Sequence, residues 1–296
     1  MKRATKETLA GRRYLDLQRE ARRMGRPTDE LIQLYALECF LDRLVHSEFA
    51  EKFVLKGGVL LAALEARRPT RDIDLAARAL ENSVDEVLGV VRKVAGILLD
   101  DGLEFDSGGA TAGLIREEDS YNGVRVTLGG QLSRAMIRLH VDVNVGDPIW
   151  PEPQQVVFPR LLDGKLLIRG YPLEMVLAEK IITAIARGSA NTRWRDFVDI
   201  YVLARRHAVQ PVTLRASLGC VAQYRRIVLV PLTSVFAGYA EFAQPRWLAW
   251  LRKNHLESAI PTDFAVVLEL VRAFADPVLL AESPDKMWNP ERCKWE

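Results

Sequence analysis

The chain has 296 residues, 49% of them hydrophobic and 27% charged, with a formal net charge of +2 at pH 7. These values are typical of a folded globular protein with one large or two smaller domains, and they exclude a largely disordered chain and a uniformly basic nucleic-acid-binding surface. No apolar run approaches the ~20 residues of a membrane span, and no apolar signal core follows the N-terminus, so we expect a cytoplasmic protein without membrane contact. Cys39, Cys220 and Cys293 lie far apart, which fits a reducing compartment better than a disulfide framework.

The N-terminal segment differs from the rest in charge. Residues 1–26 hold nine Lys and Arg against three Asp and Glu, a basic patch that can attract the phosphate backbone of RNA without sequence preference. After it, apolar residues recur at helical spacing from Asp29 to His46, and the spacing predicts an amphipathic helix.

Residues 53–74 carry the most informative motif. Gly57 and Gly58 follow a short apolar segment and predict a turn into a helix, whose amide groups and dipole can bind phosphate, although a purely structural turn is the alternative. An apolar, helix-like stretch then leads to Asp72 and Asp74. Because side chains alternate along a strand, both carboxylates are expected on one face, close enough to bind one or two divalent cations. An ordinary strand-end pair of carboxylates is the alternative.

Thr70 stands two residues before Asp72 and is expected to face the same side if the strand begins there. Its hydroxyl could then contact substrate, and a modification adding about −1.5 to −2 charges would disfavour a nucleotide triphosphate. A β-favouring threonine at a strand start is the alternative interpretation.

The next segments predict a helix over 83–99 and short strands around 113–115, 124–128 and 136–145. In the last strand Leu139, Val141 and Val143 alternate with His140, Asp142 and Asn144, as in a half-buried strand. Asp142 is therefore the natural third metal ligand beside Asp72 and Asp74. Several prolines between residues 148 and 159 predict an irregular connection after it.

From Pro172 to Leu280 the pattern is predominantly helical. Lys180 lies in a predicted amphipathic helix over 173–187, where a solvated helix-face lysine is the alternative to a phosphate-binding one. Asp196 and Asp199 lie three residues apart in a second helix over 194–205, and either could orient Lys180. Trp247 and Trp250, beside arginines, could stack RNA bases or fill a core edge. Residues 283–296 predict a loose tail that Trp288 and Trp295 could dock.

The order of these motifs resembles that of the DNA polymerase beta-like nucleotidyltransferases, in which a glycine pair, a D-x-D and a third Asp correspond here to Gly57-Gly58, Asp72-Ile73-Asp74 and Asp142. Phe53 to Gly58, Thr70 to Asp74, Glu179-Lys180 and Arg195 to Asp199 narrow the resemblance to the AbiEii family of nucleotidyltransferase toxins, which includes the MenT toxins. The motifs span residues 53–199, about half of the chain. One departure is Val59, where the family commonly has Ser or Thr.

The resemblance implies an α+β fold, with a nucleotidyltransferase domain over 1–170, built on a mixed β-sheet flanked by helices and including the N-terminal helices. A mainly helical domain over 171–296 would contribute Lys180 and Asp196. It further implies Mg²⁺ or Mn²⁺ on Asp72, Asp74 and Asp142, and a nucleotide triphosphate (NTP) bound by Gly57, Gly58, Thr70 and Lys180, with Asp196 supporting catalysis.

The function implied is that of a toxin that transfers nucleotides from NTP to RNA, with the 3′ acceptor end of tRNA as the expected target, blocking translation until a cognate antitoxin counteracts it. Two alternatives stay open. The same carboxylates would serve transfer to a protein side chain or a small molecule, and a silent module could only bind RNA or a partner.

Overall fold

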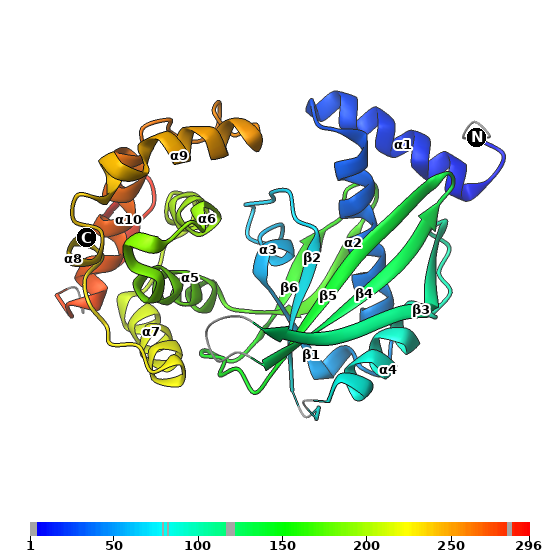
Figure 1. The fold of residues 1–296 in the computed structure, drawn as a ribbon, viewed down its shortest axis with the longest axis horizontal. Helices are drawn as coiled ribbons and strands as arrows, with labels where there is room; N and C mark the ends of the chain where they lie inside the picture. The colour runs from blue at the N-terminus through cyan, green and yellow to red at the C-terminus, as the bar shows by residue number, and fades with distance from the viewer. Residues whose placement is uncertain (1–4, 79, 82, 117–121, 283–285) are drawn as a thin grey trace. The chain divides into compact units, whose positions relative to one another are not determined.

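The computed structural model describes residues 5–78, 80–81, 83–116, 122–282 and 286–296 (Figure 1). The chain divides into two compact units, one of residues 1–147 with 153–171 and one of residues 148–152 with 172–296. The first unit is a mixed α/β layer and the second is mainly helical. The expected α+β class, with a mixed sheet flanked by helices, is confirmed.

The first unit contains a seven-stranded sheet with the strand order β3-β4-β5-β2-β1-β7-β6. The strands are β1 (Phe53–Lys56), β2 (Asp72–Ala77), β3 (Leu103–Arg116), β4 (Asn122–Leu132), β5 (Ala135–Val145), β6 (Gln154–Pro159) and β7 (Lys165–Gly170). Strand β2 runs parallel to β5 and antiparallel to β1, while β3, β4 and β5 form an antiparallel meander. Because β2 is central, its side chains meet neighbours on both sides.

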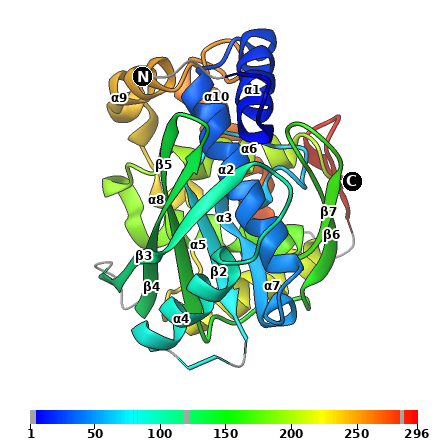
Figure 2. The same ribbon diagram turned by 90° about the vertical axis from the view of Figure 1, so that its right-hand side faces the viewer.

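Helices α1 (Leu9–Met24), α2 (Thr28–Val45) and α4 (Val84–Ala95) pack on this sheet. Helix α2 contacts β5, β7 and α4, and Figure 2 shows it lying across one face of the strands. Beneath the helices the apolar residues of the central strands, such as Ile73, Leu75, Val141 and Val143, are buried. The first unit therefore has an apolar face under the helices, and the alternating polar side chains of β2 and β5 lie on the opposite face.

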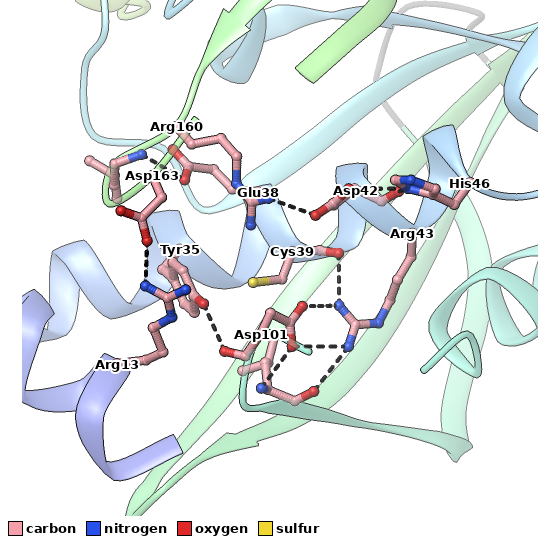
Figure 3. Close-up of polar contacts among 12 residues, drawn as sticks. Arg13, Tyr35, Glu38, Cys39, Asp42, Arg43, His46, Asp101, Arg160 and Asp163 are labelled. Carbon is pink, nitrogen blue, oxygen red and sulfur yellow. Dashed lines mark hydrogen bonds and ion pairs between the residues drawn. The ribbon is translucent and has the colours of Figure 1, made fainter. Parts of the chain in front are cut away.

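Buried ion pairs hold α2 in place (Figure 3). Arg43 forms a fork with Asp101, and its Nη2 also donates to the Leu103 carbonyl at 3.0 Å. Earlier on α2, Glu38 forms an ion pair with Arg67 at 2.6 Å. Asp42, next to Arg43 in sequence, forms one with Arg160 at 2.6 Å. Burial raises the pKa of Glu38, and the charge of Arg67 and the hydrogen bond from the Leu161 amide reduce this rise only in part. Since these partners come from three separate segments, α2 is joined to the segment before β2, to the segment between α4 and β3 with the start of β3, and to the β6–β7 hairpin.

Four expectations for this unit need correction. The helix after the glycine pair, α3 (Gly57–Leu60), is only four residues long and continues as turns. The helix expected over 83–99 ends at Ala95. The strands thought to be short are 11 to 14 residues long. The connection expected to be irregular holds β6 and β7, because the prolines lie before and at the end of β6, where a missing amide costs no ladder bond inside the strand.

The second unit is built from α5 (Leu173–Arg187), α6 (Trp194–Ala204), α7 (Pro211–Arg225), α8 (Leu232–Val235), α9 (Tyr239–Lys253) and α10 (Phe264–Leu279). Helix α10 contacts α6, α7, α8 and α9. Its Phe264 lies within a cluster of rings, with centroids 5.0 Å from Trp247 and 5.5 Å from Trp194. Short 3₁₀ turns, η1 (Ala50–Lys52) and η2 (Gly188–Ala190), complete the helical elements of the described residues.

The C-terminal segment is docked. Strands β8 (Trp288–Asn289) and β9 (Lys294–Trp295) form a small hairpin, and the Trp288 side chain is fully buried. Its Nε1 donates to the Ala204 carbonyl at 2.6 Å, and its ring meets Phe274 edge-on at 4.9 Å. Of the two expectations for the tail, docking by tryptophan is therefore confirmed for residues 286–296. Across the described residues, no helix combines the length and hydrophobicity needed to cross a membrane.

Replacing Trp288 by Ala is expected to destabilise the protein by about 3 to 5 kcal/mol, because it leaves a cavity against α10 and an unpaired Ala204 carbonyl. Urea denaturation followed by circular dichroism measures the change. The neighbouring Met287→Ala is the control, since Met287 is 47% exposed, and it should cost little. Equal effects of the two substitutions would show that Trp288 does not anchor this segment.

Candidate active site

A row of four charged residues crosses the polar face of the sheet at one level. Arg125 on β4 lies opposite Asp142 on β5, Asp142 lies opposite Asp74 on β2, and Asp74 lies opposite Lys56 on β1. Residues in register on neighbouring strands point to the same face. The row therefore holds two adjacent carboxylates between two cations.

Asp72 lies one level away on the same face of β2, with His140 of β5 as its neighbour in register. The His140 ring is hydrogen-bonded to the Thr127 hydroxyl at 3.1 Å. The structure thus brings Asp72, Asp74 and Asp142 onto one face of two adjacent strands, as the alternation in the sequence predicted.

This arrangement disfavours the charged form of Asp74. Burial raises its pKa to about 6, and the charges of Asp142 and Asp72 act in the same direction. Lys56 and a hydrogen bond from the Gly58 backbone amide act against the rise. The charged form of Asp74 is therefore disfavoured, mainly by burial.

Two features of the structure require glycine at position 57: the backbone conformation there and the closeness of the Asp74 side chain. The φ of Gly57 is +65°, in the left-handed region, and a Cβ at this position would overlap the Asp74 carboxyl group. At Gly58 a Cβ would lie 2.9 Å from the Thr70 hydroxyl and 3.1 Å from Nη1 of Arg68. The glycine pair therefore brings the backbone after β1 against the D-x-D segment.

Thr70 lies outside β2, which begins at Asp72. The strand alternation used to orient it does not apply there. Its hydroxyl donates to the Asp72 backbone carbonyl at 3.4 Å and lies next to Gly58, so Thr70 adjoins the start of β2 and the glycine pair.

In the second unit, Lys180 is buried between two carboxylates. Its Nζ is 2.7 Å from Asp199 and 3.3 Å from Asp196, and its side chain is 11% exposed. The alternative of a solvated helix-face lysine is therefore wrong. Asp199 is 2% exposed and pairs with Lys180, so it is not a surface carboxylate. Asp196 also forms an ion pair with Arg193 at 2.9 Å.

The sequence profile of one protein family matches residues 39–288, and this family is described as the nucleotidyl transferase AbiEii toxin of type IV toxin–antitoxin systems. The chain belongs to the AbiEii family. The membership expected from the motifs is confirmed, and the AbiEii protein is thus a nucleotidyltransferase of a toxin family whose systems include an antitoxin.

Two solved structures of Helicobacter pylori proteins are similar to this AbiEii protein. JHP933 has 16% identity and a TM-score of 0.47, with 83% of this chain and 91% of that chain covered. A provisionally assigned nucleotidyltransferase has 15% identity and a TM-score of 0.46, with 82% and 95% covered. No curated protein sequence matches the chain.

The residue types of the AbiEii carboxylates fit a hard divalent cation, which prefers carboxylate oxygens. Within the described residues, however, no three His, Cys, Asp or Glu side chains are already arranged as a metal site. At Asp142, Nε and Nη2 of Arg125 donate to the two carboxylate oxygens at 2.7 and 2.6 Å.

Arg125 and Lys56 were missed as site residues. Along β4 the buried Val124, Val126 and Leu128 alternate with Arg125 and Thr127, a signal that places Arg125 on a polar face but not beside Asp142. Lys56 is buried and bonds Asp147 at 2.7 Å. Both residues follow only from the strand register.

Several residues predicted to contact RNA have partners within the protein. Trp247 is fully buried and its Nε1 donates to the Pro261 carbonyl at 3.1 Å, so the core interpretation holds for it. On α1 and at its end, Arg13, Arg19, Arg23 and Arg26 pair with acidic residues. The basic patch of the sequence is therefore partly neutralised among the described residues. The roles of Lys180 and Asp196 in catalysis stay predictions.

Asp74→Asn should stabilise the metal-free protein at pH 7.5 by up to about 3 kcal/mol, the cost of ionising a group whose pKa is raised from 3.8 to about 6. Since the folded protein binds the Asp74 proton more tightly than the unfolded chain, wild-type stability rises as pH falls from about 6 towards 4, and the advantage of the variant should disappear there. Urea denaturation in EDTA at pH 7.5 and 4.5 measures this. Asp85→Asn, which neutralises an exposed carboxylate on α4, is the control and should change the stability little at either pH. An Asp74→Asn effect independent of pH would contradict the prediction.

Lys180→Met should destabilise the protein by about 3 to 5 kcal/mol, because it leaves the buried carboxylates of Asp196 and Asp199 without their common cation. Thermal unfolding with Lys253→Met, which removes an exposed lysine of the same unit, gives the comparison. Similar unfolding temperatures for the two variants would mean that Lys180 is not held as an internal ion pair.

Proposed function

We propose that this protein is a Mg²⁺-dependent nucleotidyltransferase, also able to use Mn²⁺, that transfers nucleotides from NTP to RNA, with the 3′ acceptor end of tRNA as its target. The observation that carries the proposal is the register pairing of Asp74 with Asp142, with Asp72 on the same face. Carboxylates placed side by side on two strands, with a raised pKa at one of them, are suited to a metal-dependent phosphoryl transfer.

In this proposal Asp72, Asp74 and Asp142 hold the metal. A bound divalent cation would neutralise the triphosphate and activate the attacking hydroxyl of the acceptor. The protein residues hold the ligands in place: β2 and β5 fix the spacing of Asp74 and Asp142, and the Gly58 amide orients Asp74.

The NTP would lie against Gly57, Gly58 and Thr70, which adjoin the carboxylates within the first unit. The four-residue α3 supplies little helix dipole, and Val59 offers no hydroxyl. Side-chain cations are therefore needed to bind the phosphates. By family resemblance Lys180 is one of them, oriented by Asp196 and Asp199.

RNA is proposed as the acceptor because the family is one of toxins, and a capped tRNA end would stop translation and growth. NTP and tRNA are both cytoplasmic, which is where the protein is expected to act. The antitoxin that accompanies the family would counteract the activity.

The proposal is tested by incubating the purified protein with Mg²⁺, each labelled NTP in turn and total tRNA, and resolving the products on a denaturing gel. Label on tRNA is expected and identifies the nucleotide. Label on protein would instead indicate side-chain nucleotidylation, and no label would favour a small-molecule acceptor or a silent binding module.

Asp72→Ala should abolish transfer, a loss of at least about 100-fold, while circular dichroism shows an intact fold, because two remaining carboxylates cannot hold the metals in place. Asp85→Ala, which removes an exposed carboxylate on α4 of the same unit, should retain full transfer. Full transfer by Asp72→Ala would sink the assignment of the site.

A further inference from the structure

Arg125 occupies the carboxylate that the metal needs. It donates from Nε and Nη2 to the two oxygens of Asp142, the bidentate geometry that suits a guanidinium group. A divalent cation bound to Asp142 would compete for the same oxygens and repel the guanidinium charge. Metal binding and the Arg125–Asp142 pair therefore oppose each other at this carboxylate.

The surroundings of Arg125 leave it room to move. Its side chain is 44% exposed, whereas that of Asp142 is 10% exposed. Its neighbour in register on β3 is Gly113, and a Cβ added at Gly113 would meet no atom within 4 Å. On β3, the strand next to β4, the place of a side chain at position 113 is therefore open space beside Arg125.

Lys56, at the other end of the row, contrasts with Arg125. It is buried, bonds the 3% exposed Asp147 and lies 5.6 Å from the centre of the Tyr171 ring. Arg125 thus joins a partly exposed cation to a proposed metal ligand. A guanidinium displaced from Asp142 keeps the planar fork that binds phosphate oxygens in pairs.

We propose that Arg125 is an exchangeable counterion of the active site, which holds Asp142 in the metal-free protein and moves to a phosphate group of the substrate when a divalent cation takes Asp142. This inference rests on the proposed nucleotidyltransferase function and adds a residue to it. The phosphate can belong to the NTP or to the RNA acceptor, and both present the same oxygens.

The first test measures metal binding without any substrate. Mn²⁺ binding to wild type, Arg125→Ala and Arg125→Lys is followed by electron paramagnetic resonance of the free ion. Arg125→Ala should bind Mn²⁺ up to about fivefold more tightly, because removing a partly exposed partner frees Asp142, and Arg125→Lys should fall between the two. Gly113→Val keeps the arginine but fills the space beside it, so it should bind Mn²⁺ more weakly than wild type.

The second test measures transfer. Arg125→Ala should raise the KM for the substrate whose phosphate it binds by about 10- to 100-fold, the range expected for a lost charge-assisted hydrogen bond. A rise for NTP alone identifies the triphosphate, and a rise for tRNA alone identifies the acceptor. Arg292→Gln, which removes an exposed arginine paired with Glu296, is the control and should change neither quantity.

For Arg125→Ala we expect tighter Mn²⁺ binding but weaker substrate binding. This combination distinguishes the proposed role from a structural one, since a damaged fold would weaken both metal and substrate binding. Unchanged or weaker Mn²⁺ binding by a folded Arg125→Ala variant overturns the inference, as does an unchanged KM for both substrates. If wild type binds Mn²⁺ but transfers nothing to any acceptor, the proposed function fails, and the Mn²⁺ series still decides whether Arg125 competes for Asp142.

Discussion

The first unit depends on holding Asp74 and Asp142 next to each other on parallel strands. Burial, and then the charge of Asp142, raises the pKa of Asp74 to about 6, which corresponds to a cost of about 3 kcal/mol for ionising Asp74 at neutral pH. The same strands bury Ile73, Leu75, Val141 and Val143 on their other face. Burial of each such side chain contributes about 1.5 to 3 kcal/mol, so the apolar face outweighs the cost of ionising Asp74. The core therefore holds Asp74 and Asp142 side by side.

The two cations that end the charge row differ in a way that matters for function. Lys56 is enclosed and paired with Asp147, so its charge is a fixed part of the first unit. Arg125 is partly exposed beside the bare backbone of Gly113, so its charge can move. The row therefore combines a fixed cation at one end with a movable one at the other, and the movable one is paired with the proposed metal ligand Asp142.

Much of this was predictable, because strand and helix periodicities are local. The alternation around Asp72, Asp74 and Asp142 placed all three on polar strand faces, and the helix expected over 173–187 is α5. The prolines between 148 and 159 concealed β6, because proline statistics cannot tell an edge strand from a loop. The helix after Gly58 was overestimated, since an apolar stretch alone does not distinguish a helix from a series of buried turns.

The sequence by itself determined which residues are proposed to carry the chemistry, because the glycine pair, the three carboxylates and Lys180 all stand in motifs that can be found along the chain. Only the tertiary structure decided their partners. Arg125 meets Asp142 through the register of β4 and β5, and Asp199 meets Lys180 through the packing of α6 on α5. Such pairings depend on residues distant in sequence, and periodicity, which reports only a side chain's face, carries no information about what lies opposite it.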